Sequence, residues 1–297
     1  MTTPQQLHIP VLLDAVLDLL KPAQSETYLD LTAGYGGHAR EVIARIGAAN
    51  LATLVDRDEF AISQLEDLAQ NGARVIRLDF LNAAQELSEQ GEKFDMILLD
   101  LGVSSPQLDR FDRGFSFRGE GVLDMRMDQS QDLTAAKIVN RYSEKDIFRI
   151  LTEYGEERSG MAAKIAHAIA TTRKKNPFMT TTDLAELVKK VKGGWGKIHP
   201  ATQTFQAVRI AVNDELGQLE RVLPVLPDLL NPGGRLAIIS FHSLEDRIVK
   251  NFLKDQCEAG FESIMKNLTK HPISGDMNDV NNPRARSAKL RAAVKTK

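Results

Sequence analysis

The stretch Asp30-Leu31-Thr32-Ala33-Gly34-Tyr35-Gly36-Gly37-His38 decides the fold of this chain. It joins an apolar run at 28–31 to a helix-like segment at 38–46. A glycine-rich loop between a buried strand and a helix is typical of open α/β sheets, which bind ligands at the carboxyl ends of their strands. Because glycine has no Cβ atom, the three glycines let the backbone approach such a ligand closely. We therefore expect a ligand-binding loop here.

Apolar runs and amphipathic segments alternate on both sides of this loop, after a short helix predicted at 11–20. Strands are predicted at 28–31, 51–55, 74–78 and 94–99, and helices at 38–46, 59–69 and 82–90. The pattern resumes late in the chain with a helix at 205–229, a strand at 235–240 and a helix at 244–254. Such alternation is typical of a parallel sheet with helices on both faces.

The two remaining regions have different patterns. From Lys289 to Lys295, apolar and mostly basic residues alternate with period two, which predicts a final antiparallel strand paired with one near 261–268. Between 105 and 204 the sequence is loop-like and then helical, without strand-like runs. We predict an α/β fold with a mostly parallel, Rossmann-like sheet, formed by a catalytic domain at 1–105 and 205–297. An inserted helical domain at 106–204 is expected to recognise the substrate.

Composition narrows the class of protein. With 297 residues, 42% of them hydrophobic and 26% charged, the chain is typical of a soluble globular protein. No apolar run predicts a membrane span or a signal peptide, and a cytoplasmic location is expected. Cys257 is the only cysteine, which excludes an internal disulfide and a cysteine-based metal cluster. The six histidines have no paired ligand spacing, so no metal site is predicted.

Charge is segregated along the chain, although the net charge is only −2. Residues 1–105 hold 16 acidic and 7 basic side chains, a net of −9, whereas residues 158–213 hold 10 basic and 2 acidic side chains, a net of +8. The tail at 284–297 adds six basic residues and no acid. Each basic run alone is compatible with a solvated helix face, but two of them beside one catalytic unit favour a polyanionic substrate.

Acidic residues lie at the ends of the first four predicted strands, namely Asp30, Asp56, Asp79 and Asp100. Asp30 suits a cofactor that carries an ammonium group, Asp56 suits ribose hydroxyls, and Asp79 with Phe80 offers an acceptor and a ring to an adenine. A helix N-cap is the alternative role for each residue. A dinucleotide is disfavoured because the third glycine of its fingerprint is replaced by Ala39. Together these positions favour S-adenosylmethionine.

Ordered sequence blocks resemble the bacterial small-subunit ribosomal RNA cytosine-N4 methyltransferase family. They are 30–38, 98–108 (LLDLGVSSPQL), 113–117 (RGFSF), 123–127 (LDMRM), 154–158 (YGEER), 199–210 (HPATQTFQAVRI), 238–247 (IISFHSLEDR) and 282–287 (NPRARS). The first loop departs from the family at Leu31 and Tyr35. The resemblance implies the sheet of an S-adenosylmethionine-dependent methyltransferase and methylation of a cytosine amine in the decoding region. The substrate would be small-subunit ribosomal RNA or the assembled small subunit. The cofactor contacts that it implies are Gly36, Gly37, His38, Asp56, Phe80, Asp100 and Gln107.

The residues themselves favour the same chemistry. A cytosine amine is a poor nucleophile, and Asp100 is the best candidate to accept its hydrogen bond and so act as the catalytic residue. The two prolines that follow this position in many amine methyltransferases are absent, so the alternative role of Asp100 is to hold the cofactor. Cys257 lies away from every predicted strand end, which argues against methylation at ring carbon five. Candidate groups for stacking on the base, or for accepting hydrogen bonds from it, are Phe115, Phe117, Phe241 and His242, and His199 is a candidate phosphate contact. Open alternatives are a methyltransferase acting on protein or a small molecule, an inactive RNA-binding assembly factor and a dinucleotide oxidoreductase.

Overall fold

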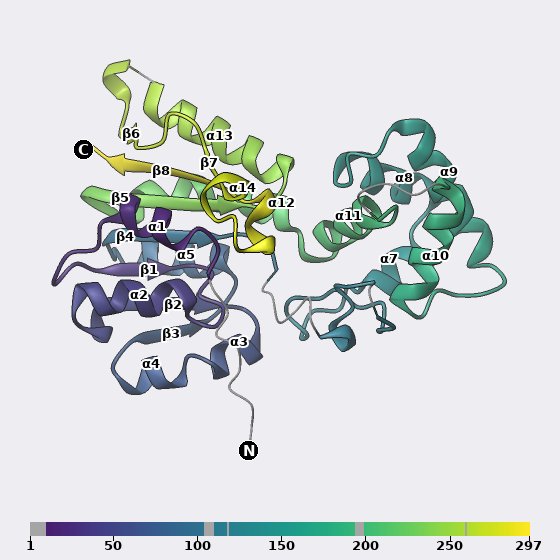
Figure 1. Cartoon of the computed structure of the whole chain (residues 1–297), viewed down its shortest axis with the longest axis horizontal. Helices are drawn as coiled ribbons and strands as arrows, with labels where there is room; N and C mark the ends of the chain where they lie inside the picture. The colour runs from purple at the N-terminus through teal and green to yellow at the C-terminus, as the bar shows by residue number, and fades with distance from the viewer. Residues whose placement is uncertain (1–9, 104–109, 118, 194–198, 259) are drawn as a thin grey trace. The chain divides into compact units, whose positions relative to one another are not determined.

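The computed structural model of the chain describes residues 10–103, 110–117, 119–193, 199–258 and 260–297 (Figure 1). The chain forms two compact units. The sheet unit consists of Met1–Gly102 and Leu216–Lys297, and the helical unit consists of Val103–Glu215.

The sheet unit is built on eight strands in the order β3-β2-β1-β4-β5-β8-β6, with β7 paired to β8. The strands are β1 Tyr28–Asp30, β2 Ala52–Asp56, β3 Arg74–Arg77, β4 Phe94–Asp100, β5 Leu230–Ser240, β6 Met265–Asn267, β7 Ile273–Ser274 and β8 Lys289–Lys295. Strands β1 to β5 are parallel to one another, whereas β8 is antiparallel to β5, β6 and β7. The predicted α/β fold of a mostly parallel sheet with an antiparallel C-terminal strand is confirmed.

Helices connect the strands as the sequence predicts, with two differences. They are α1 Leu13–Leu20, α2 Gly37–Ile46, α3 Glu59–Ser63, α4 Glu66–Gln70, α5 Phe80–Glu89, α12 Glu215–Val222, α13 Ser243–Glu258 and α14 Gly275–Asn278. The helix predicted at 59–69 is two short helices. The helix predicted at 205–229 is interrupted at Asp214, whose φ is +49°, and ends in 3₁₀ geometry at Leu223–Leu229, a segment that contains two prolines.

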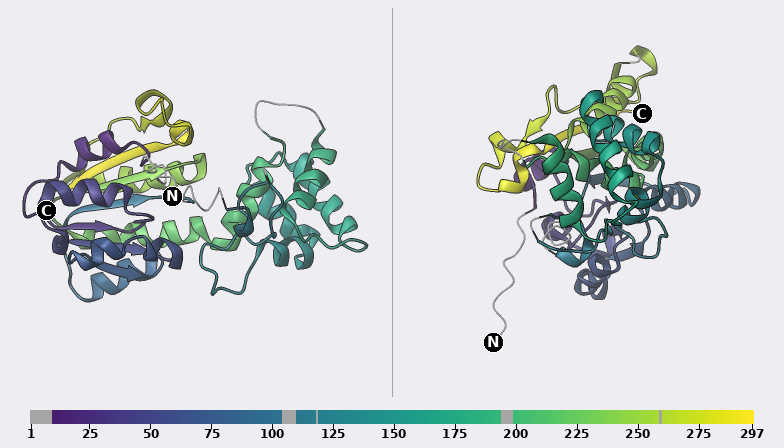
Figure 2. Two further views of the ribbon diagram at one scale, coloured as in Figure 1. Left: turned by 60° about the horizontal axis from the view of Figure 1, so that its bottom comes forward. Right: turned by 90° about the vertical axis from the view of Figure 1, so that its right-hand side faces the viewer.

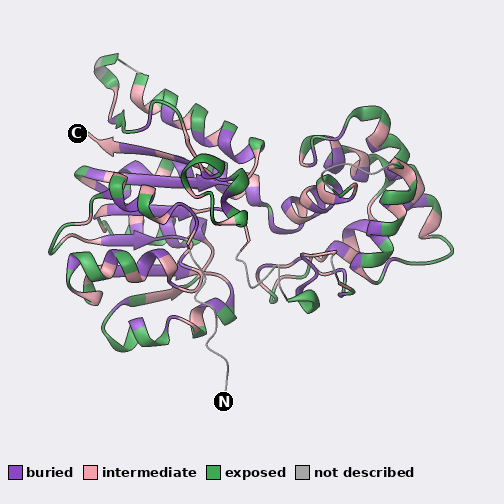
Figure 3. Cartoon of the chain, in the orientation of Figure 1, coloured by how far each residue is buried: buried purple, intermediate pink, exposed green. Residues whose placement is uncertain are grey.

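Alternating side chains of the strands fill two hydrophobic cores, one on each face of the sheet. In β4, Ile97 and Leu99 pack in the core that contains residues of α5, α12 and α13, whereas Met96 and Leu98 pack in the core that contains residues of α1, α2 and α4. Helices therefore cover both faces, and the central strands are buried (Figures 2 and 3). Each fully buried aliphatic side chain contributes roughly 1.5–3 kcal/mol.

Part of the basic tail has a structural role in the sheet unit. On β8, Lys289 Nζ and Arg291 Nε donate hydrogen bonds to the carboxylate of Asp246 on α13, at 3.0 and 2.8 Å. Lys295 Nζ donates to the carbonyl oxygens of Pro227 and Leu230. These three of the tail's six cations hold the last strand in place and are therefore not available to attract a substrate.

The helical unit has its own core. Its helices are α7 Ala135–Arg141, α8 Glu144–Glu153, α9 Ser159–Thr172, α10 Thr181–Lys192 and α11 Thr202–Asn213. Side-chain oxygens of Thr134, Ser143 and Thr180 accept backbone N–H groups at the starts of α7, α8 and α10, which satisfies donors that a helix leaves unpaired. Phe205 and Val208 of α11 are buried in this core. The unit therefore extends to residue 215 rather than ending at 204, because the apolar face of α11 packs on other helices.

Candidate active site

Three strands bring acidic residues to one edge of the sheet. Asp30 ends β1, Asp56 ends β2 and Asp100 ends β4. In the register of the sheet, Asp30 is paired with Leu98, and Asp100 with Ile239. The end of β5, Ser240, thus lies one residue beyond the partner of Asp100. Because the carboxyl ends of parallel strands meet at this edge, the geometry is that of a ligand-binding site in an open α/β sheet.

The glycine loop turns sharply between β1 and α2. Gly34 and Gly36 have φ values of +53° and +78°, which glycine adopts without steric cost. A Cβ atom on Gly37 would lie 2.7 Å from Cγ of Pro10. The neighbouring His38 is buried, and its Nε2 is 3.0 Å from the carbonyl oxygen of Val11. The segment before α1 therefore packs directly on the loop, a contact that the sequence does not reveal.

Asp56 ties the loop to β2. Its two carboxylate oxygens accept hydrogen bonds from the backbone N–H groups of Gly34, at 2.9 Å, and Asp58, at 2.8 Å. Burial raises the pKa of Asp56, and these two bonds oppose the rise. The carboxylate keeps further lone pairs, so it remains able to accept from ribose hydroxyls, and its predicted role in cofactor binding stays a prediction.

Asp30 ends β1, directly before the glycine loop, and is buried. It accepts hydrogen bonds from the hydroxyl of Tyr28, at 2.8 Å, and from the backbone N–H of Thr32, at 3.1 Å. Burial raises the pKa of Asp30 to about 7, against the hydrogen bonds, and the charge of Asp56 adds to the rise. This carboxyl group therefore holds the start of the loop through Thr32 and, when ionised, places negative charge next to it.

Asp100 is the acidic residue with an unused acceptor. Its backbone N–H donates to Oγ1 of Thr32 at 2.6 Å, which fixes the end of β4 against the loop. Its Oδ1 atom is buried and accepts no hydrogen bond from the described residues. Burial raises the pKa of Asp100 well above its ordinary value, and the negative charges of Asp30 and Glu245 raise it further. A buried acceptor without a partner is costly in a protein, and it marks the place where a ligand would be bound.

Asp79 caps the start of α5, which is the alternative to cofactor binding that the sequence left open. Its Oδ1 accepts from the backbone N–H groups of Leu81 and Asn82 at 3.0 and 2.9 Å, and its Oδ2 accepts from the side chain of Asn82. Phe80 begins α5 and is 8% exposed in the hydrophobic core, so a contact with adenine remains a prediction. Gln107, the last predicted cofactor contact, lies outside the described residues.

Three residues that support the site were missed by the sequence analysis. Tyr28 and Thr32 were counted only as part of a strand and a loop, and Glu245 only as part of a sequence block. Glu245 is 2% exposed, and its Oε2 accepts from the backbone N–H groups of Phe241 and His242. A glutamate three residues after His242, at the start of a predicted helix, is one half of the capping-box signal, in which the usual serine or threonine is here replaced by histidine.

In the helical unit, the structure separates the basic residues into two groups. Arg173 donates to the carbonyl of Val139 at 2.8 Å, Arg209 pairs with Glu215, and Lys192 pairs with buried Glu157. By contrast, the exposed basic residues of this run include Arg158, Lys164, Lys174, Lys175, Lys189 and Lys190. The run is therefore partly structural and partly a charged surface.

The predicted aromatic contacts also divide between core and surface. Phe115 is buried in the core of the helical unit. Phe117 stacks on exposed His199, with ring centroids 4.5 Å apart, and meets Phe205 edge-on at 4.9 Å. Nδ1 of His199 accepts from the backbone N–H of Ala201. Whether any of these rings meets RNA remains a prediction.

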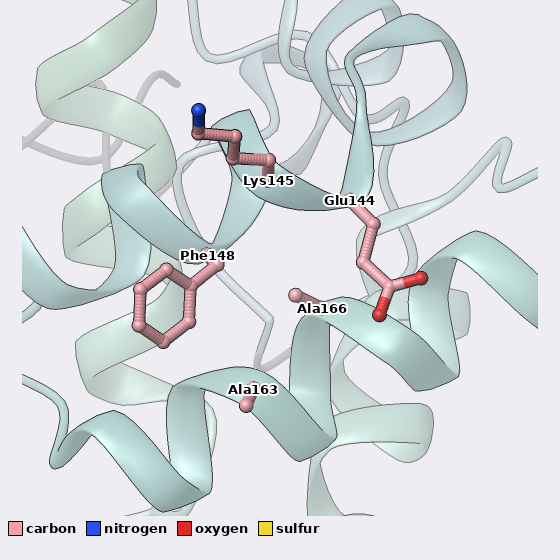
Figure 4. A pocket seen from close by; sticks show the side chains of 5 residues that line it. All are labelled: Glu144, Lys145, Phe148, Ala163 and Ala166. Carbon is pink, nitrogen blue, oxygen red and sulfur yellow. The ribbon is translucent and has the colours of Figure 1, made fainter.

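The helical unit also contains a hollow of about 380 Å³ between α8 and α9 (Figure 4). Its lining residues are Glu144, Lys145, Phe148, Ala163 and Ala166, and Nδ1 of His167 lies 3.2 Å from Oε1 of Glu144. No predicted site residue lines this hollow. Within the described ranges, no His, Cys, Asp and Glu residues are grouped so as to hold a metal ion.

Comparison with known proteins identifies the family. A model of the MraW methylase family matches residues 5–296 of the chain. The chain belongs to the MraW methylase family. It is 49% identical to the ribosomal RNA small subunit methyltransferase H of Synechocystis sp., with 97% of this chain and 93% of the relative covered. It is 44% identical to the protein of the same name from Heliobacterium mobile, with 97% and 98% covered. For the Deinococcus radiodurans protein the identity is 45%, with 96% and 88% covered.

Membership of the MraW family confirms the resemblance seen in the sequence, and with it a methyltransferase that uses S-adenosylmethionine. The residues at the sheet edge fit this cofactor. Asp30, Asp56 and Asp100 make the edge acidic, which suits a ligand with an ammonium and a sulfonium group. Asp100 has an unused acceptor, and Asp56 has lone pairs to spare. None of the helices in the described part of this MraW methylase has the length and apolar character that a membrane crossing requires.

Proposed function

We propose that this MraW methylase transfers the methyl group of S-adenosylmethionine to the exocyclic N4 amine of a cytosine in the decoding region of small-subunit ribosomal RNA. The observation that carries the proposal is the buried, unused Oδ1 of Asp100 at the sheet edge, in a chain closely related to small subunit methyltransferases. The naked RNA or the assembled small subunit is the partner, and the cytoplasm is the place of action.

The chemistry requires positioning more than acid or base strength. The lone pair of a cytosine amine is delocalised into the ring, so the amine attacks a methyl group only when it is held in line with it. Asp100 accepts a hydrogen bond from the amine, which increases the electron density on nitrogen and fixes its orientation. When bound, the cofactor supplies an electrophilic methyl group on a positively charged sulfur. Gly36, Gly37, His38, Asp56 and Phe80 would hold it.

The helical unit supplies the attraction for RNA. Residues 1–105 carry a net charge of −9 and repel a polyanion, whereas the segment at 158–213 carries +8. Exposed side chains, which phosphate contacts require, include Lys174, Lys175 and Lys190. Such contacts position the substrate without reading its sequence, so base recognition falls to the sheet edge.

The test is methyl transfer from labelled S-adenosylmethionine to small subunits that lack the modification, followed by mass mapping of the RNA. We expect one methyl group per subunit, on the N4 atom of a single cytosine. Label on protein, on a small molecule or on ring carbon five would overturn the proposal. Tight binding of subunits without any transfer would instead indicate an assembly factor.

A further inference from the structure

The start of α13 contains an unusual helix cap. His242 precedes the helix, and its Nδ1 accepts from the backbone N–H of Glu245 at 3.4 Å. In return, Oε2 of Glu245 accepts from the backbone N–H groups of Phe241, at 2.7 Å, and His242, at 3.3 Å. This reciprocal pattern is a capping box, in which serine or threonine ordinarily takes the position held here by histidine. Capping alone does not require an imidazole ring.

The second ring nitrogen of His242 has no role in the cap. Because a backbone N–H donates to Nδ1, the ring proton resides on Nε2, which is therefore a donor. The side chain is only 9% exposed, and Nε2 is 3.2 Å from Oε1 of Glu245. That approach lacks hydrogen-bond alignment, and Nε2 has no hydrogen-bond partner in the part of the chain that the structure describes. The structure thus contains a buried donor without an aligned acceptor.

This donor follows the strand adjacent to the one that ends with the acceptor of the proposed reaction. β4 and β5 are adjacent, with Asp100 paired to Ile239, so His242 follows β5 at the same edge. The ring of Phe241 is close to Gly102, where an added Cβ would be 3.4 Å from Cδ2 of the ring. Asp100 Oδ1 and His242 Nε2 are thus two buried, unused polar atoms, one acceptor and one donor, at the ends of adjacent strands.

We propose that Nε2–H of His242 donates a hydrogen bond to the ring nitrogen next to the target amine, which makes His242 a specificity-determining residue. An acceptor and a donor presented from the ends of adjacent strands match the edge of cytosine, where the N4 amine donates and N3 accepts. They reject uracil, where O4 accepts and N3 carries a hydrogen. This inference rests on the proposed function, since it names how the same site reads its base.

Two substitutions separate the cap from base recognition. His242→Asn keeps a side-chain oxygen that caps helices well, but its side chain is shorter and has no donor at the position of Nε2, whereas His242→Ala removes both the cap and the donor. We expect His242→Asn to retain the melting temperature within about 2 °C and the cofactor dissociation constant within about twofold. Its single-turnover rate on small subunits at saturating cofactor should fall by about 10- to 100-fold, because a polar group of the base loses its partner. His242→Ala should show the same loss of rate together with a lower melting temperature.

A base analogue tests the atom that is recognised. Small subunits assembled with 3-deazacytidine at the methylated position lack the ring acceptor but keep the amine. The wild-type protein should methylate them more slowly than normal subunits, whereas His242→Asn should lose little or nothing further, because the interaction is already absent. Equal losses in both proteins would show that His242 does not contact N3 and would overturn the proposal. A normal rate for His242→Asn on unmodified subunits would also overturn it, as would a large loss of cofactor affinity.

The proposed function fails in a distinguishable way. If the wild-type protein transfers no methyl group to the RNA, the measurement becomes the affinity of the wild-type protein and of His242→Asn for small subunits in the presence of S-adenosylhomocysteine. Weaker binding of normal subunits by His242→Asn, with matched binding of the 3-deazacytidine subunits, would support recognition of the base without catalysis. Matched binding of both kinds of subunit would overturn it.

Discussion

Nδ1 of His38 lies 3.7 Å from Oδ2 of Asp100, while the opposite ring nitrogen faces the carbonyl oxygen of Val11 at 3.0 Å. A carbonyl oxygen only accepts, so Nε2 carries a hydrogen, and a neutral His38 presents an acceptor to Asp100. Burial and the negative charges of Asp30 and Glu245 raise the pKa of Asp100, which favours its protonated form when no cofactor is bound. A cationic cofactor opposes that effect and favours the carboxylate that the proposed reaction requires.

Replacement of Asp100 by asparagine should therefore affect the reaction more than the fold. Asparagine has nearly the same shape and removes the repulsion from Asp30 and Glu245, so the melting temperature at pH 8 should stay the same or rise. We expect the single-turnover rate to fall roughly 100-fold or more, with a smaller loss of cofactor affinity, because an acceptor aimed at the amine acts mainly in the transition state. A normal rate at saturating cofactor would show that Asp100 only binds the cofactor.

Replacement of Asp56 by alanine should weaken S-adenosylmethionine binding by about 1–3 kcal/mol, since charged hydrogen bonds to ribose are lost. It also removes the bonds to Gly34 and Asp58, so the melting temperature should fall. Calorimetric titration measures the affinity. Asp95→Ala is the matched control, because Asp95 lies near the opposite end of β4 and its carboxylate also accepts a backbone N–H, that of Thr27, so the variant should lose stability and leave the affinity unchanged. Equal affinities for wild type and Asp56→Ala would contradict the assignment.

Asp30 should make the cofactor-free protein less stable as the pH rises. Its pKa is about 7 in the folded protein, against an ordinary value of 3.8. Between these values the folded state binds more protons than the unfolded state, so the free energy of unfolding falls with increasing pH. Asp30→Asn abolishes this pH dependence. Between pH 4 and pH 8 the free energy of unfolding of the variant should therefore rise by about 1–3 kcal/mol relative to that of the wild type. Denaturant unfolding across that range is the measurement, and parallel curves for the two proteins would rule the effect out.

Substitution of Lys174 and Lys175 by glutamine should weaken RNA binding without affecting the cofactor. Both side chains are exposed, and the loss should be similar for all RNA sequences and should reduce the salt dependence, because fewer counterions are released. Arg173 is kept, since it donates to the carbonyl of Val139 and its loss would destabilise the helical unit. A salt series identical to that of the wild type would show that these lysines are only a solvated helix face.

The sequence alone predicted the succession of strands and helices along the chain and the family. It also supplied most of the proposed cofactor contacts. Apolar periodicity identifies the strands because each central strand is buried on both faces, and the glycine loop identifies the edge that binds ligands. The sequence also placed Asp100 at this edge, since the carboxyl ends of parallel strands meet there.

Only the tertiary structure decided which polar atoms are already engaged. Asp56 and Asp79 are alike in sequence, yet one ties the glycine loop to β2 and the other caps α5. Arg173 and Lys174 are neighbours, yet one is bound to a backbone carbonyl and the other is exposed. The unused Oδ1 of Asp100 and Nε2 of His242 depend on contacts between strands and helices that are far apart in the chain. Periodicity reports only whether a position is buried, whereas hydrogen bonding depends on the direction of each side chain and on its partners in space.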